Sequence, residues 1–126
     1  SNGWHDEVAF GGHGTGVASV IAGTGRGNGV YGVAPEAVIL PVRIADEHGH
    51  SPDARVGVAI RWAVDHGADV INLSLGTASD GRHAISGRNR RAEHAATRYA
   101  VQQGVIVVAA AGNEELCSRL SNALTA

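Results

Sequence analysis

The stretch DVINLSL, Asp69 to Leu75, decides the fold because it predicts a short strand that is buried on both faces. It is rich in β-branched residues and nearly continuous in its apolar character, as the strands of a parallel sheet covered by helices are. The runs AVILPVRI (residues 37–44) and VIVVAAAG (residues 105–112) have the same character. We therefore expect three strands, each covered on both faces.

The segment before Asp69 predicts a helix over residues 51–67. Ser51 is a good N-cap, Pro52 suits the first helical position, and Asp53 complements the positive end of the helix dipole. Gly67 fits a left-handed C-cap. Between these signals apolar residues recur at helical spacing, namely Val56, Ile60, Ala63 and Val64.

The segment after Leu75 predicts a second helix, over residues 91–104, which closes at Gly104. A third helix is predicted over His13–Ala22, where apolar residues stand among alanines and glycines. Small residues let a helix lie close to its neighbours, so we expect this third helix to be buried. The apolar face of the second helix is formed by Ala92, Ala95, Ala96, Tyr99 and Ala100.

Strands and helices therefore alternate along the chain. This order is typical of a parallel sheet with right-handed crossovers and of the α/β class. In open sheets of this kind, reactive groups collect at the carboxyl ends of the strands. The segments SLG (Ser74–Gly76) and AAGN (Ala110–Asn113) fall at such ends, so we expect candidate functional residues there.

Composition limits the class of protein and of partner. The chain has 126 residues, 44% of them apolar, which suits one soluble globular domain with a modest core. A formal net charge of −2 favours neither nucleic acid nor an anionic membrane as a partner. No apolar run approaches the ~20 residues that a membrane helix needs. The one cysteine, Cys117, leaves no internal disulfide, and nothing indicates an oligomeric state or a compartment.

His13 stands in the glycine-rich stretch FGGHGTGVASVIAG, residues 10–23. A histidine that only packs in a core does not need adjacent glycines, and a glycine-rich turn does not need a histidine. Taken alone, the residue still favours a core or helix-capping histidine over a catalytic one. The decision depends on the segments that accompany it.

Four blocks occur in order between Gly12 and Asn113, namely GHGTGVASVIAG, VYGVAPEAVILPVRI, VINLSLG and VVAAAGN. Together they resemble the subtilisin-like serine peptidases (subtilases). The resemblance implies a three-layer α/β sandwich with a parallel sheet, truncated here at both ends. It makes residues 1–126 a part of a subtilase catalytic domain, and it implies hydrolysis of peptide bonds through a Ser-His-Asp triad.

The resemblance assigns roles to single residues. His13 corresponds to the general base, which takes the proton of a serine hydroxyl and returns it to the leaving amine. Asn113 corresponds to the side-chain donor of the oxyanion hole. An extended polypeptide substrate would pair with the main chain at Gly49 and His50 by β-augmentation. The residues that resemble the lining of the pocket for the residue before the scissile bond are Ser74, Leu75, Gly76, Ala111 and Gly112.

The triad is incomplete within these residues. In subtilisin the aspartate precedes the histidine by ~32 residues and the serine follows it by ~157, whereas 12 residues precede His13 and 113 follow it. We therefore expect the chain to be inactive alone. The competing hypothesis is a pseudopeptidase remnant, which keeps a peptide-binding or structural role without the chemistry.

No metal or cofactor is expected. Several members of the resembled family bind calcium at the loop that corresponds to TGRGNGV (residues 24–30), but here Arg26 stands where an oxygen ligand is expected. GNGVYG (residues 27–32) matches the G-x-G-x-x-G pattern of dinucleotide sites. No predicted strand precedes it, and Ala34-Pro35 follows where a helix should begin, so a dinucleotide-binding protein is the weakest alternative.

Overall fold

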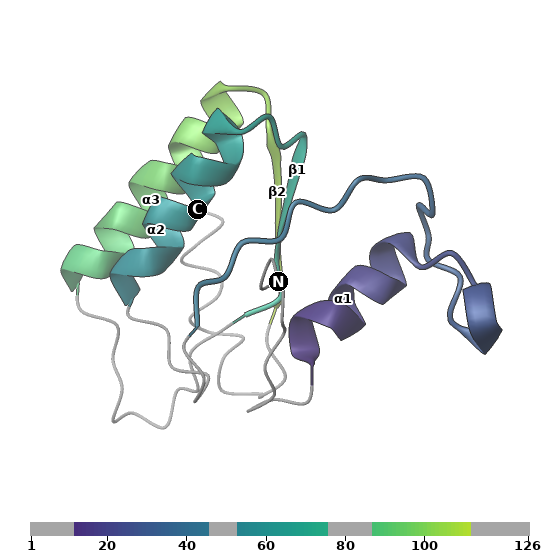
Figure 1. Ribbon diagram of the computed structural model, residues 1–126. Helices are drawn as coiled ribbons and strands as arrows, with labels where there is room; N and C mark the ends of the chain where they lie inside the picture. The colour runs from purple at the N-terminus through teal and green to yellow at the C-terminus, as the bar shows by residue number, and fades with distance from the viewer. Residues whose placement is uncertain (1–11, 46–52, 76–86, 112–126) are drawn as a thin grey trace. The chain divides into compact units, whose positions relative to one another are not determined.

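The computed structural model describes residues 12–45, 53–75 and 87–111. The chain divides into two compact units, Ser1–Ser51 and Pro52–Ala126. The described elements, in chain order, are helix α1 (His13–Ala22) and the 3₁₀ turn η1 (Arg26–Asn28) in the first unit, then α2 (Asp53–Asp65), β1 (Val70–Leu73), α3 (Gly87–Gln102) and β2 (Ile106–Ala109) in the second (Figure 1).

β1 and β2 form a parallel pair, with α3 as the crossover between them. The register runs from Val70 opposite Ile106 to Leu73 opposite Ala109. The ladder continues beyond β2, because the Ala110 amide donates to the Leu73 carbonyl at 3.1 Å. The strands predicted within residues 69–75 and 105–112 are therefore confirmed over the shorter ranges of β1 and β2, and so is their parallel pairing.

The core of the second unit lies between this pair of strands and the two helices, which lie on the same face of it (Figure 1). Ile60 of α2 is 2% exposed, and Ala96 and Ala100 of α3 are 0% exposed. These residues belong to the apolar faces predicted for both helices, so the 3.6-residue periodicity identified the side of each helix that is buried. The other buried apolar residues are Val56, Ala63, Ile71 and Val105.

α2 and α3 pack closely because a glycine lies between their backbones. A Cβ atom at Gly57 would stand 3.2 Å from the carbonyl oxygen of Ala92, which is tight for a side chain. Both helices then end as predicted, since Gly67 and Gly104 each adopt a left-handed φ of 81°. The Gly67 amide donates to the Val64 carbonyl at 3.1 Å, which closes the end of α2.

The prediction that the strands are buried on both faces is wrong for β1 and β2. Val70 is 56% exposed, Ile106 61% and Val108 49%. Along β1 exposed residues alternate with the buried Ile71 and the half-buried Leu73, whereas in β2 every residue except the half-buried Val107 is exposed. The described helices of this unit cover one face of the strand pair. A run of apolar residues alone does not show whether a strand is covered on one face or on both.

The strand predicted over residues 37–44 is also wrong. This segment forms no strand, and Val38 is 95% exposed. A strand needs a neighbour for its amides and carbonyls. Among the described residues of the first unit, the β pairing is a single antiparallel bridge between Thr24 and Tyr31. Residues 37–44 therefore have the composition of a strand, but the described residues of this unit offer them no partner strand.

α1 has the predicted bounds, His13–Ala22, but the prediction that it is buried is wrong, since none of its residues is. Within the first unit, residues 32–34 form a return segment that is hydrogen-bonded to the last turn of the helix. There the Val33 amide donates to the Val20 carbonyl at 3.1 Å and the Ala34 amide to the Ile21 carbonyl at 2.8 Å. In the described ranges, no helix has both the length and the apolar character needed to cross a membrane.

Candidate functional site

His13 is the first residue of α1, and a glycine determines where this helix begins. Gly12, which precedes the histidine, adopts the left-handed conformation with φ 77° and ψ 38°, a region that glycine enters without steric cost. The Gly12 carbonyl accepts the first helical hydrogen bond, from the Gly16 amide at 2.8 Å. The His13 side chain is exposed. A glycine beside the histidine thus allows a sharp entry into the helix and leaves the imidazole accessible.

The carboxyl ends of β1 and β2 bring two predicted pocket segments together. Ser74 and Leu75 directly follow β1, and Ala111 lies two residues after the end of β2. Because Leu73 pairs with Ala109, the two segments leave the sheet side by side. The Ser74 hydroxyl oxygen accepts a hydrogen bond of 2.9 Å from the Asn72 side-chain amide. Leu75 is 42% exposed, and Ala111 is exposed as well, so both can meet a ligand.

Five predicted site residues lie outside the described residues, and His13 belongs to the first unit while Ser74, Leu75 and Ala111 belong to the second. The structure therefore describes the local setting of four of the predicted residues. The predicted oxyanion donor, Asn113, is outside the described residues, which end two positions earlier at Ala111. The residues outside are Gly49, His50, Gly76, Gly112 and Asn113.

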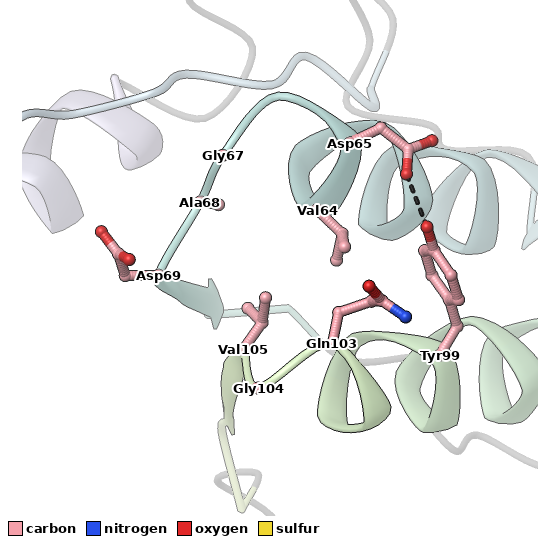
Figure 2. A pocket seen from close by; sticks show the side chains of 9 residues that line it. All are labelled: Val64, Asp65, Gly67, Ala68, Asp69, Tyr99, Gln103, Gly104 and Val105. Carbon is pink, nitrogen blue, oxygen red and sulfur yellow. Dashed lines mark hydrogen bonds between the residues drawn. The ribbon is translucent and has the colours of Figure 1, made fainter.

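The sequence did not predict a shallow, open depression of about 340 Å³ at the opposite edge of the strand pair. Asp69 precedes β1 and Val105 precedes β2, so this depression lies at the amino ends of the strands. Figure 2 shows the Tyr99 hydroxyl directed at Asp65, to which it donates a hydrogen bond of 2.7 Å. The lining residues are Val64, Asp65, Gly67, Ala68, Asp69, Tyr99, Gln103, Gly104 and Val105.

Tyr99 links α3 to α2 through two contacts. Besides its bond to Asp65, its ring lies under the Arg61 guanidinium, whose central carbon is 5.0 Å from the ring centroid. The hydrogen bond to Asp65 raises the pKa of the Tyr99 hydroxyl above its ordinary value, desolvation and the negative charge of Asp65 raise it further, and the positive charge of Arg61 opposes them. Since the bonded residues are 34 positions apart, no local pattern could reveal the pair.

The raised pKa predicts how stability depends on pH. Folded Tyr99 holds its proton more tightly than unfolded tyrosine, so the stabilisation is fully present below about pH 10. It is lost as pH rises through the folded-state pKa. We expect Tyr99→Phe to remove this fall in stability at alkaline pH. Melting temperatures measured between pH 8 and 12 would reveal the difference. The control is Tyr31→Phe in the first unit. If this variant, and not Tyr99→Phe, lacks the fall in melting temperature at alkaline pH, the assignment to Tyr99 is wrong.

Trp62, a large apolar residue of α2, does not lie in the core. It is 39% exposed and stacks on His66, with ring centroids 3.8 Å apart and an angle of 21° between the planes. The two residues are four positions apart, so they lie on the same face of α2. That face points away from the buried Ile60 and Ala63, which explains the exposure of Trp62.

The glycine motif after α1 can be compared with what a dinucleotide site requires. A dinucleotide site needs a helix after the glycine motif, yet residues 33–45 form none, so this alternative is wrong. Within the described parts of the chain, no group of three or more His, Cys, Asp or Glu side chains is arranged to hold a metal ion.

Comparison with known proteins identifies relatives. The profile of the Subtilase family matches residues 1–125. Thermitase of Thermoactinomyces vulgaris is 43% identical over 103 residues, which are 81% of this chain and 34% of that protein. The thermophilic serine proteinase of Bacillus sp. (strain AK1) is 40% identical over 110 residues, 86% of this chain and 25% of that protein. The minor extracellular protease Epr of Bacillus subtilis (strain 168) is 38% identical over 103 residues, 82% of this chain and 15% of that protein.

Proposed function

The chain belongs to the subtilase family, and from this membership we propose that it carries the general base and the oxyanion donor of a serine endopeptidase. The observation that carries the proposal is His13 as the first residue of α1, preceded by the left-handed Gly12, with its side chain exposed. The identity of the chain to the serine proteinase and protease relatives supports the same activity. The α/β class of the family agrees with the parallel strand pair and its helices.

In the proposed mechanism, His13 takes the proton from a serine hydroxyl while the serine oxygen forms a bond to the carbonyl carbon of the substrate. The carbonyl oxygen becomes an oxyanion, and the Asn113 amide donates a hydrogen bond to it. The protonated His13 then gives its proton to the amine as the peptide C–N bond breaks, which leaves an acyl-enzyme. In the second half, His13 takes a proton from water while the water oxygen bonds to the acyl carbon. His13 then returns the proton to the serine oxygen as the acyl–serine bond breaks and the acid product leaves.

The serine and the aspartate of the triad are proposed to come from outside these 126 residues. The chain spans 15 to 34% of the length of three curated relatives that it matches. The spacing of the triad in subtilisin puts both partners beyond residues 1–126. The 126 residues are therefore proposed to be a part of the catalytic domain that is inactive alone.

The proposed substrate is a polypeptide in extended form. Ser74, Leu75 and Gly76 would form one wall of the pocket for the residue before the scissile bond. Ala111 and Gly112 would form the other wall. The parallel register of β1 and β2 supports this arrangement, because it holds Leu75 and Ala111 on adjacent strand ends. The main chain of the substrate would pair with residues 49–50 by β-augmentation.

Covalent labelling tests the proposal. The gene product that contains these residues is treated with a fluorophosphonate, which reacts with the activated serine of serine hydrolases. We expect one labelled serine outside residues 1–126, and we expect His13→Ala to abolish the labelling while the protein stays folded. A folded gene product that takes no label and still binds unstructured peptides would instead support the pseudopeptidase hypothesis.

A further inference from the structure

The loop between α1 and Gly32 can be tested for its fit to the calcium ion that the family resemblance implies. Calcium takes six to eight oxygen ligands, with carboxylates prominent among them. The loop TGRGNGV, residues 24–30, contains no Asp or Glu and carries the cationic Arg26. Two of its carbonyl oxygens already accept hydrogen bonds, that of Val30 from the Gly25 amide and that of Arg26 from the Gly29 amide, both at 3.2 Å. The side-chain oxygens of the loop are those of Thr24 and Asn28, both uncharged, so the loop offers no negative charge to balance a calcium ion beside Arg26 and its donor set does not fit calcium.

A tyrosine closes the loop. Thr24 and Tyr31 form an antiparallel bridge across it. The Tyr31 ring lies directly against Gly25, so that a Cβ atom on that glycine would collide with the ring. Gly25 also has a φ of 69°, which an L-residue with a side chain rarely adopts. Both the conformation and the contact therefore require glycine at position 25.

The closed loop in turn holds the end of α1. The last carbonyls of a helix have no partner within the helix, and here residues after the loop supply partners for the Val20 and Ile21 carbonyls. The Gly32 amide donates to the Gly23 carbonyl at 2.8 Å. A Cβ atom on Gly32 would stand 2.5 Å from the Ile21 oxygen, so the return segment contacts the helix backbone directly.

We propose that residues 23–34 form a metal-free clasp, in which Tyr31 packed on Gly25 and the backbone hydrogen bonds close the loop on the last turn of α1. The clasp holds the loop against the end of α1 without a calcium ion. The contact uses the face of the Tyr31 ring. Phenylalanine can therefore replace tyrosine, and alanine cannot. The inference concerns local stability and stands whether or not the proposed catalytic function is correct.

Hydrogen exchange measured by mass spectrometry on peptides that cover residues 20–34 tests the clasp locally. In the unsubstituted protein, we expect the same protection of this segment in EDTA and in excess Ca²⁺. Tyr31→Ala should make the amides of the segment exchange about tenfold faster, while Tyr31→Phe keeps their protection. Val33→Ala is the matched control, because Val33 is 92% exposed and only its backbone takes part.

Two results would overturn the proposal. One is protection of residues 20–34 that falls in EDTA and returns with Ca²⁺, since the loop would then depend on a metal ion. The other is an effect of Tyr31→Ala no larger than that of Val33→Ala. If Tyr31→Ala unfolds the protein, the EDTA comparison on the unsubstituted protein still decides between a clasp and a metal site.

Discussion

Replacing His13 by alanine is expected to abolish peptide hydrolysis by the gene product that contains this chain. The expected loss in kcat is about 10⁶-fold, the magnitude measured when the catalytic base is removed from subtilisin, a related enzyme. Alanine offers no group that can take the serine proton or protonate the leaving amine. Steady-state kinetics on a chromogenic peptide would measure the loss in kcat, and KM should change far less.

A second histidine provides the matched control. His66 is exposed near the end of α2, where it stacks on Trp62, and it has no part in the proposed chemistry. We expect His66→Ala to leave kcat unchanged. Equal losses in the two variants would show that the effect of His13→Ala comes from a general loss of folded protein. Full activity in His13→Ala would remove this residue from the mechanism.

Replacing Asn113 by alanine is expected to lower kcat by about 10²–10³-fold, equivalent to about 2.7–4 kcal/mol of transition-state stabilisation. This magnitude is the one measured on subtilisin for loss of its oxyanion-hole asparagine. Asn113 is proposed to hydrogen-bond the oxyanion more strongly than the ground-state carbonyl, so the loss should fall on kcat and leave KM nearly constant. Separate determination of kcat and KM on one peptide substrate measures this.

A side-chain amide at the other edge of the strand pair controls for Asn113. Gln103 lines the depression at the amino ends of the strands, so Gln103→Ala should leave both constants unchanged. An increase in KM with kcat retained in Asn113→Ala would mean that Asn113 binds ground state and transition state equally. The oxyanion role would then be wrong.

Most helix bounds could be predicted because their signals are local. Gly67 and Gly104 end their helices at the predicted positions, and both have the left-handed conformation that the C-cap rule requires. The apolar periodicity of α2 identified Ile60 as core, and it is 2% exposed. His13 as the first residue of α1 likewise follows from the adjacent glycines. In each case, the residues that determine the structure lie within a few positions of one another.

The features that sequence could not predict depend on distant partners. Residues 37–44 have the composition of a strand, but composition does not supply a neighbouring strand. Trp62 is apolar enough for a core, yet its position on α2 points it away from one. The bond between Tyr99 and Asp65 exists only because α2 and α3 pack side by side. The roles of Asn113 and of the pocket segments likewise came from the family resemblance, since no local pattern assigns them.

If the ends of β1 and β2 line the proposed substrate pocket, their pairing determines which positions can be varied to change substrate preference. The spacing of these ends is set by backbone atoms, through the Leu73–Ala109 register and the bond from the Ala110 amide to the Leu73 carbonyl. Side chains at Leu75 and Ala111 are exposed beyond that ladder, so they can be varied without breaking it. A combinatorial library randomised at these two positions should therefore keep the strand pairing in most members and vary the shape of the proposed pocket.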